Sequence, residues 1–352
     1  MKIHLVTGFL GSGKTTAIHN AALKLLQQKI NVGIITNDQG IKLVDTNFFK
    51  NSNIPNEQVI NGCFCCNYNA LEKSLQSLVA LHHSEVVFAE AVGSCTDIIA
   101  TVFKPMLQFN SHAGITVSTF ADVRLLQMIL NNQPNNFDES INYIYLKQLE
   151  EANIIVVNKV DLITKPQLQI IKEKMQQQYG KKILLYQNSL DGDSIQLWLN
   201  TLNNSSNAGT QKSLEIDYNT YAEGEAMLAW LDAELQITSA DNNALKTTED
   251  FINKMYQKIN LQQLSIGHLK FLVNQQQKIS FTSNTQPLIS IKNTSTSTAH
   301  LLINIRVQAA PLQLKTILLE TMQEIKASNN CNMLTLSLDC FKPGYPTPIH
   351  RM

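Results

Sequence analysis

A glycine-rich run close to the N-terminus has the residue types and the spacing that bind a phosphate. The run reads GFLGSGKTT and satisfies the pattern G-x-x-x-x-G-K-[ST], between an apolar, β-branched segment and a helical pattern. A strand, a glycine loop and a helix in this order direct backbone N–H groups at a phosphate. Lys14 is expected to reach the β- and γ-phosphates, and Thr15 to ligate Mg²⁺. The nucleotide-binding residues predicted here are Gly8, Gly11, Ser12, Gly13, Lys14, Thr15 and Thr16.

Three thiols within four residues form a second group that could do chemistry. Gly62 precedes the run CFCC; in an extended turn Cys63 and Cys65 fall on one side, and Cys66 needs a local bend to join them. Thiolates suit a soft cation such as Zn²⁺ or Cu⁺. Zinc takes four ligands, so three cysteines leave one position for water or a distant side chain. We predict that these three residues bind zinc. The spacing alone leaves two alternatives open, which are buried inert thiols and a redox pair.

Carboxylates follow two of the apolar runs. The run SEVVFAE ends in Glu90, as a Walker B strand does, and such an acid holds Mg²⁺ directly or through water. Asp38 follows another run and could also help to hold Mg²⁺, or it could be a solvated turn residue. Gly93 then lies where a nucleotide-sensing switch would pivot. Cys95, in the same segment, could add a ligand to the cysteine cluster, although an ordinary buried thiol is expected.

The tetrapeptide NKVD, which follows the apolar run IIVV, has the form N-K-x-D that reads a guanine base. Guanine offers N1–H and N2–H₂ as neighbouring donors, and the Asp161 carboxylate can accept both. Adenine would leave that carboxylate without its donors, which is a strong basis for rejection. Lys159 is expected to lie along the base and Asn158 to brace the loop. After a phosphate-binding loop, this pattern predicts GTP as the nucleotide.

The order of the apolar runs predicts an α/β chain with a P-loop NTPase domain and a smaller C-terminal α+β domain. Strands that alternate with helices favour a mainly parallel sheet with helices on both faces. We expect the first domain at 1–202, a polar linker at 203–213 and the second domain at 214–352, with helices on one face of a mainly antiparallel sheet. The elements expected in the second domain are strands at 224–237, 267–273, 278–282, 288–292, 301–308 and 333–338, and helices at 248–259 and 311–326.

Composition excludes several classes of partner. The chain has 28 basic and 28 acidic residues, so no general attraction to nucleic acid or to an anionic membrane is expected. No run approaches the about 18 apolar residues of a membrane span, and the N-terminus lacks a signal-peptide pattern. We therefore expect a cytoplasmic protein whose six cysteines are thiols or metal ligands and not disulfides.

Taken together, these motifs resemble the CobW/HypB/UreG family of P-loop GTPases, and the C-x-C-C signature resembles its CobW-like metallochaperone branch. Two further stretches, 90–97 and 341–351, resemble a cobalamin-synthesis-like subgroup of that branch. The resemblance implies a Mg²⁺-dependent GTPase, with Lys14, Thr15 and Glu90 in the catalytic roles, that delivers Zn²⁺ or Co²⁺ to a metalloprotein client. A nucleotide-dependent homo-oligomer is also possible in such a family. The chain departs from the family pattern where N-E-x-G reads NDQG and where E-T-x-G reads EAVG.

Two other functions compete with that of a GTPase metallochaperone. One is a nucleotide-gated metal carrier or sensor with negligible turnover, because no catalytic glutamine or arginine finger can be assigned and slow intrinsic hydrolysis is expected. The other is a small-molecule kinase, against which both N-K-x-D and the cysteine cluster argue. The second domain carries no catalytic constellation, and His268 and His350 are expected to be structural.

Overall fold

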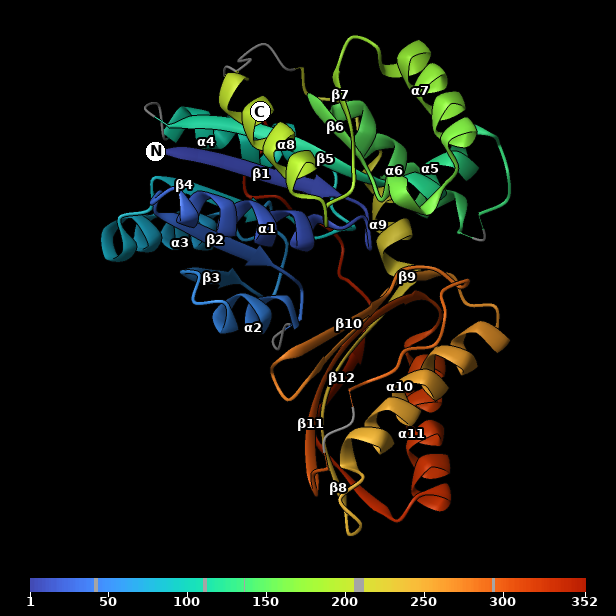
Figure 1. Ribbon diagram of the computed structural model, residues 1–352. Helices are drawn as coiled ribbons and strands as arrows, with labels where there is room; N and C mark the ends of the chain where they lie inside the picture. The colour runs from blue at the N-terminus through green and yellow to red at the C-terminus, as the bar shows by residue number, and fades with distance from the viewer. Residues whose placement is uncertain (41–43, 110–112, 136, 206–211, 293–294) are drawn as a thin grey trace. The chain divides into compact units, whose positions relative to one another are not determined.

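The computed structural model describes residues 1–40, 44–109, 113–135, 137–205, 212–292 and 295–352 (Figure 1). The chain divides into two compact units, each assembled from separate stretches of sequence. The first unit comprises Met1–Gln39, Asn53–Gly224 and Tyr345–Met352, and the second comprises Gly40–Ser52 and Glu225–Gly344. Three stretches therefore differ from the expected division: 40–52 joins the second unit, whereas 214–224 and 345–352 join the first. Most of the expected linker, residues 206–211, lies outside the described residues.

A seven-stranded sheet forms the centre of the first unit, in the order β3-β2-β4-β1-β5-β6-β7. Every neighbouring pair is parallel. The strands are β1 (Lys2–Gly8), β2 (Val32–Asn37), β3 (Asn56–Val59), β4 (Val86–Glu90), β5 (Gly114–Asp122), β6 (Ile154–Asn158) and β7 (Ile183–Gln187). Consecutive residues of β2, β4 and β6 are all buried, because helices cover both faces of a parallel sheet. The predicted mainly parallel sheet is confirmed.

Helices connect most of the successive strands of this unit, as parallel strands require. They are α1 (Lys14–Gln27), α3 (Tyr68–His82), α4 (Lys104–Phe109), α5 (Val123–Leu130), α6 (Glu139–Glu151), α7 (Lys165–Tyr179), α8 (Gly192–Asn204) and α9 (Tyr218–Ala226), with a π-helical segment at Ile99–Phe103 and a short 3₁₀ turn at Val160–Leu162. Loops that leave the carboxyl ends of the strands meet at one edge of the sheet, which is where ligands bind in such folds.

The second unit is an antiparallel sheet of five strands in the order β10-β9-β11-β8-β12. Its elements are α2 (Val44–Asn51), β8 (Leu228–Ser239), α10 (Ala244–Leu261), β9 (Ile266–Val273), β10 (Gln277–Phe281), β11 (Thr298–Gln308), α11 (Pro311–Ser328) and β12 (Cys331–Phe341). The helices α10 and α11 pack together, and with one face of the sheet they enclose an apolar core (Figure 1). The predicted α+β architecture is confirmed.

Two expected elements of this unit differ in the structure. The strand expected from residue 224 begins at Leu228, because α9 continues to Ala226. No strand forms at 288–292, where side chains of α10 bind the backbone in place of a neighbouring strand. Asn253 Oδ1 accepts from the Ile289 N–H at 2.9 Å, and Glu249 Oε2 accepts from the Ile291 N–H at 2.6 Å.

The helix α2 and Gly40, which come from the middle of the first unit's sequence, pack on the second unit's sheet. Lys270 and Lys278 form ion pairs with Asp45 at the start of α2, the second at 2.7 Å. Burial opposes a charge on Asp45, but the two ammonium groups hold its pKa well below the usual range. A Cβ atom at Gly40 would collide with Asp232 of β8. Charge pairing and close approach therefore bind this stretch to the second unit.

Candidate nucleotide and metal sites

The predicted phosphate-binding loop joins β1 to α1 in the first unit. Gly13 stands before the first residue of α1 in the left-handed region, at φ 95°, and a Cβ atom there would collide with the Asn158 side chain. Only glycine meets both conditions. The Lys14 ammonium is buried and donates to the carbonyl oxygens of Gly8 and Phe9, at 2.7 and 3.2 Å. The loop therefore holds its lysine over its own backbone, beside the helix N-terminus.

The two oxygen groups expected to hold Mg²⁺ lie together, one in the first turn of α1 and the other at the carboxyl end of β4. The Thr15 hydroxyl donates to Glu90 Oε1 at 2.8 Å, and both residues are buried. The parallel pairing of β1 with β4 sets Val6 opposite Glu90 and so brings the acid to the loop. A hydroxyl and a carboxylate are hard oxygen donors of the kind that Mg²⁺ takes, so these residues fit the ion.

Asp38, the third expected Mg²⁺ residue, follows the last residue of β2 and is partly buried. Its backbone N–H donates to the Val59 carbonyl at 3.2 Å. Thr36, two residues earlier, pairs with Glu90 across the sheet. The structure thus brings Asp38 to the same sheet edge as Glu90.

The N-K-x-D residues lie where β6 ends. Asn158 bridges two loops, because its Nδ2 donates to the Ser12 carbonyl at 2.8 Å while its Oδ1 accepts from the Ser189 hydroxyl at 2.8 Å. Lys159 donates to the Gly11 carbonyl at 2.6 Å and to Asp122 Oδ2 at 2.9 Å. Asp161 is exposed. The order of β1 and β6 in the sheet therefore links the base-reading tetrapeptide to the phosphate-binding loop through direct side-chain contacts.

Asp122, at the end of β5, was not selected from the sequence, yet it orients Lys159. It also accepts from Arg124, at 2.6 Å from Nη2. Burial would raise the pKa of this carboxyl, but Lys159 and Arg124 keep the pKa below its usual value, so Asp122 stays ionised. Its position at the carboxyl end of an apolar strand was the signal that could have found it.

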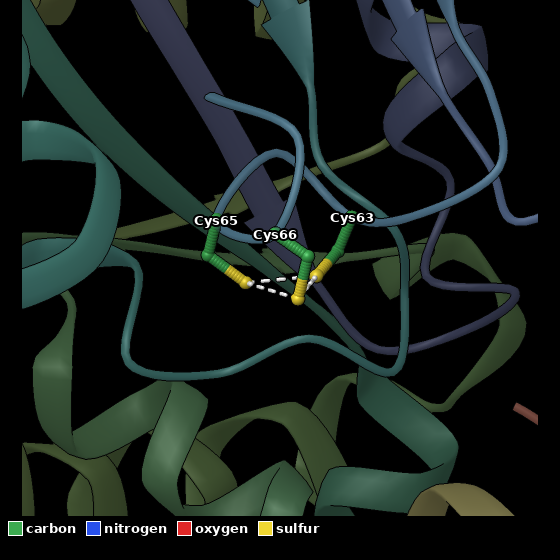
Figure 2. A group of neighbouring side chains, drawn as sticks. All are labelled: Cys63, Cys65 and Cys66. Carbon is green, nitrogen blue, oxygen red and sulfur yellow. Dashed lines mark hydrogen bonds between the residues drawn. The ribbon is translucent and has the colours of Figure 1, made fainter. Parts of the chain in front are cut away.

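The three cysteines come together in one turn between β3 and α3 (Figure 2). The sulfur of Cys63 lies 2.8 Å from that of Cys65 and 3.2 Å from that of Cys66, and the remaining pair is 3.8 Å apart. All three are free thiols. Around a tetrahedral zinc ion with Zn–S distances of about 2.3 Å, neighbouring sulfurs lie about 3.8 Å apart. One edge of the cluster already has that length, so opening the other two by 1 Å or less would admit the ion.

Local backbone geometry and one asparagine hold this turn. Asn61 and Gly62 adopt positive φ angles of 60° and 147°, which reverse the chain before Cys63. Asn37, at the end of β2, then clamps the turn: its Nδ2 donates to the Gly62 carbonyl at 2.7 Å, and its Oδ1 accepts from the Phe64 N–H at 2.8 Å. Asn37 was not predicted as a site residue, although it directly precedes Asp38. It connects the cysteine turn to the sheet edge of the phosphate site.

The thiols of the cluster share their protons unequally. Hydrogen bonds with Cys65, Cys66 and Cys95 hold the pKa of Cys63 well below its usual value. The hydrogen bond to Cys63, with burial, raises the pKa of Cys65 well above the usual value, and the same partner raises that of Cys66 to about 11. One thiolate therefore forms readily at Cys63, and the next two require a cation to balance them.

The C-terminal stretch 345–352 lies against the cysteine turn. The Thr347 N–H donates to the Cys66 sulfur at 3.3 Å, and the Ile349 N–H donates to the Cys65 carbonyl at 2.9 Å. His350 packs its ring against Tyr68, with centroids 5.0 Å apart. It is not one of the three residues whose ligand atoms cluster together. This stretch adds one N–H donor to the Cys66 sulfur and one to the backbone of the turn, and nothing in the spacing of the motifs predicted its place.

The segment after β4 connects the phosphate-binding loop to the cysteines. A Cβ atom at Gly93 would lie 2.8 Å from the Leu10 backbone nitrogen, so the two loops touch. Gln148 of α6 donates to the carbonyls of Gly93 and Cys95, at 3.0 and 2.7 Å. The Cys95 thiol, which is 1% exposed, is hydrogen-bonded to Cys63.

A family model described as "CobW/HypB/UreG, nucleotide-binding domain" matches residues 2–185 of the chain. That stretch contains the phosphate-binding loop, the cysteine turn, Glu90 and the N-K-x-D tetrapeptide. It covers more than half of the 352 residues.

Curated relatives match a smaller share of the chain. The zinc chaperone YeiR of Escherichia coli is 28% identical over 206 residues, which is 56% of this chain and 58% of the relative. The zinc chaperone YjiA of the same organism is 32% identical over 167 residues, or 46% of this chain and 49% of the relative. The zinc chaperone CobW of a Sinorhizobium species is 26% identical over 204 residues, or 51% and 56%. The chain thus spans about half to three fifths of the length of these relatives.

Solved structures give weaker likenesses. HypB from Helicobacter pylori, solved in complex with nickel, has 18% identity and a TM-score of 0.44, over 61% of this chain and 92% of that one. A GTPase of Pyrococcus abyssi in the apo form has 14% identity and a TM-score of 0.33, over 57% and 96%. Within the described ranges, the helices include none with the length and apolar character that would cross a bilayer.

Proposed function

Because the chain belongs to the CobW/HypB/UreG family, we propose that it is a GTP-dependent metallochaperone that binds zinc at Cys63, Cys65 and Cys66 and passes it to a client protein. The observation that carries this proposal is the meeting of two sites at one sheet edge. The loops that follow β1, β3, β4 and β6 hold a phosphate-binding lysine, three clustered thiols, a carboxylate and a base-reading tetrapeptide. The names of the curated relatives, all zinc chaperones, support zinc over cobalt.

Each residue at the nucleotide is proposed to have the following role, and the contacts of Lys14, Thr15 and Asn158 support the proposal. Lys14 would leave the Gly8 and Phe9 carbonyls for the β- and γ-phosphates, and the backbone N–H groups from Gly11 to Thr16 would bind phosphate oxygens. Thr15 and Glu90 would hold Mg²⁺ together, with Asp38 beside them; the bound ion supplies neutralisation of phosphate charge. Asn158 keeps the two loops together, Lys159 lies along the base, and Asp161 accepts from the guanine donors.

The proposed switch couples the two sites. Asn37 ties the cysteine turn to the end of β2, and Gly93 contacts the phosphate-binding loop. Ordering of these loops by a γ-phosphate would open the sulfur cluster to the spacing that zinc needs. GTP should therefore tighten zinc binding relative to GDP, and linkage requires zinc to tighten GTP by the same factor. Because thiols must lose protons to bind, zinc affinity should fall as the pH falls.

A chelator competition measured with GDP and with a non-hydrolysable GTP analogue tests the coupling. We expect a ratio of zinc affinities of about 5- to 150-fold in favour of the analogue. Cys65→Ser should abolish both the tight site and the ratio. Cys331→Ser, a partly buried thiol of the second unit, is the matched control. Equal zinc affinity with the two nucleotides would leave a metal site that the nucleotide does not control.

Base selectivity and turnover test the nucleotide half. GTP and GDP should bind far more tightly than ATP, and Asp161→Asn should favour xanthine nucleotides, whose position 2 carries an acceptor. Asp193→Asn removes another exposed carboxylate of the same unit and should change nothing. In a hydrolysis time course, acceleration by zinc and a client would support the chaperone. Negligible turnover under all conditions would instead leave a nucleotide-gated carrier or sensor.

A further inference from the structure

Cys95 stands beside the cysteine cluster but belongs to a different loop. Its sulfur is hydrogen-bonded to Cys63, and its side chain is 1% exposed. The group of sulfurs that all lie within 4.8 Å of one another contains Cys63, Cys65 and Cys66 and does not contain Cys95. Cys95 therefore touches the cluster at one corner, from the segment that follows β4.

A structural zinc site is closed by four ligands, and the cysteine turn supplies three. The neighbours that the C-terminal stretch offers are of the wrong kind, because the Thr347 N–H donates to the Cys66 sulfur and cannot bind a cation. His350 is engaged with Tyr68 and Phe109, at centroid distances of 5.0 and 5.4 Å. A fourth thiol in contact with the cluster matches the soft character of the other three ligands.

From these contacts we propose that Cys95 is the fourth thiolate of the zinc site, so that the ion is held by Cys63, Cys65, Cys66 and Cys95. The inference rests on the proposed zinc-binding function and names one further ligand for it. On binding, the Cys95 S–H bond is replaced by a bond from sulfur to zinc, and the proton leaves to solvent. The ligand set has no position left for water.

The place of Cys95 in the chain gives this ligand a second consequence. It lies two residues after Gly93, which contacts Leu10 in the phosphate-binding loop, and Gln148 holds the carbonyls of both Gly93 and Cys95. A shift of that loop on nucleotide exchange would carry the Cys95 sulfur toward or away from the cluster. Cys95 is then the ligand whose bond to zinc depends most directly on the nucleotide.

Zinc X-ray absorption on the full chain, loaded with Zn²⁺ and a non-hydrolysable GTP analogue, counts the sulfur ligands. We expect four sulfurs in the native protein and three in Cys95→Ala and in Cys95→Ser. Cys340→Ala, a thiol of the second unit, should keep four. Unchanged GDP affinity in the two Cys95 variants would show that they fold. In chelator competition, the ratio of zinc affinities between the GTP analogue and GDP, about 5- to 150-fold in the native protein, should fall toward 1 in both variants.

The outcomes separate this inference from the function on which it rests. If the native protein and Cys95→Ala both show three sulfur ligands, and Cys65→Ser loses zinc, the role of Cys95 is overturned and the three-cysteine site is kept. A nitrogen ligand that disappears in His350→Ala would likewise overturn it. Full zinc affinity in Cys65→Ser would remove the proposed site itself, and the fourth ligand with it.

Discussion

Each compact unit contains a buried cluster of polar side chains, and the two clusters balance their charges in opposite ways. In the second unit, Arg306 donates to Asp232 Oδ1 at 2.7 Å, and Asn304 donates to the same oxygen at 2.7 Å. The guanidinium lies 4.1 Å from the centre of the Trp230 ring. In the first unit, Cys63, Cys65 and Cys66 are groups of one kind, and their thiolates would repel one another.

The difference separates a structural cluster from a binding site. Opposite charges in contact neutralise one another. The Asp232–Arg306 cluster is closed in this sense, because β8 and β11 supply both charges. Like groups in contact can all ionise only if a cation joins them, so under the proposed function the cysteine cluster is closed by the zinc ion that it binds. The following predictions test that contrast, in order of decreasing effect.

The largest effect should come from breaking the closed cluster. Arg306→Met leaves Asp232 buried without its guanidinium, which typically costs about 3–5 kcal/mol of unfolding free energy. The double variant Arg306→Met/Asp232→Leu should recover most of that loss, because no charge remains buried. Urea unfolding measures the free energy of both variants, and hydrogen exchange in β8 and β11 reports the loss at the cluster itself. Lys254→Met, which removes a surface pair with Glu324, is the control; equal losses in the single and double variants would contradict the closed-cluster account.

Closing the open cluster should stabilise the unit that contains it. Free Zn²⁺ at about 100 times its dissociation constant should raise the unfolding free energy of the first unit by about 2.7 kcal/mol, because the ion binds only the folded turn. Removal of the ion by a chelator should reverse the gain. Hydrogen exchange in α3 and β4 should report it, and exchange in β9 and β11 should stay the same. A gain of the same size in Cys65→Ser would show that zinc acts elsewhere.

Glu151, at the end of α6, is a buried acid whose contribution to the stability of the first unit should depend on pH. Its carboxylate accepts from the Thr96 hydroxyl at 3.2 Å and from the Ile99 N–H at 3.3 Å. Burial, aided by Asp97, raises the pKa of Glu151 from 4.5 to about 8. Between those values the folded state keeps a proton that the unfolded state has lost. Its contribution to stability is therefore complete below pH 4.5 and is lost as the pH rises to about 8.

The corresponding variant is Glu151→Gln, which keeps a neutral oxygen acceptor at the same position. It should remove from the pH dependence of unfolding a slope of up to about 1.4 kcal/mol per pH unit. Urea midpoints at a series of pH values measure this slope. Glu150→Gln, whose side chain is 42% exposed, should keep the native slope. A Glu151→Gln profile parallel to that of the native protein would contradict the raised pKa.

The smallest effect should come from the rim of the open cluster. Arg351 forms an ion pair with Asp97 at 2.8 Å, and its own side chain is 42% exposed. Water and salt screen the Arg351 end of this pair, and the Tyr218 hydroxyl still donates to the buried Asp97 carboxylate at 2.7 Å. Arg351→Ala should therefore lower the unfolding free energy by less than about 1 kcal/mol, and less at high salt. Lys147→Ala, which removes the helix-surface pair with Glu150, should cost a similar amount. A salt-independent loss above about 2 kcal/mol would mean that this contact behaves as the Asp232–Arg306 pair does.

Much of this molecule could be predicted from short stretches of its sequence. Glycine spacing, a lysine and a threonine specify the phosphate-binding loop because backbone freedom and a helix N-terminus are local properties. The same holds for the three cysteines, whose sulfurs are brought together by one turn and the α3 start. The parallel and antiparallel sheets also followed from local patterns, since alternation of strands with helices and runs of short strands impose different layers.

Tertiary structure decided which distant residues complete these sites. Asn37 reaches the cysteine turn, and Cys95 reaches Cys63, because parallel strands bring their carboxyl ends to one edge whatever their distance in sequence. The stretch 345–352 returns to the cysteines, and 40–52 joins the second unit, through hydrogen bonds and ion pairs to residues far along the chain. Neither placement leaves a periodic or compositional mark, because each depends on a few contacts between residues that are far apart in the sequence.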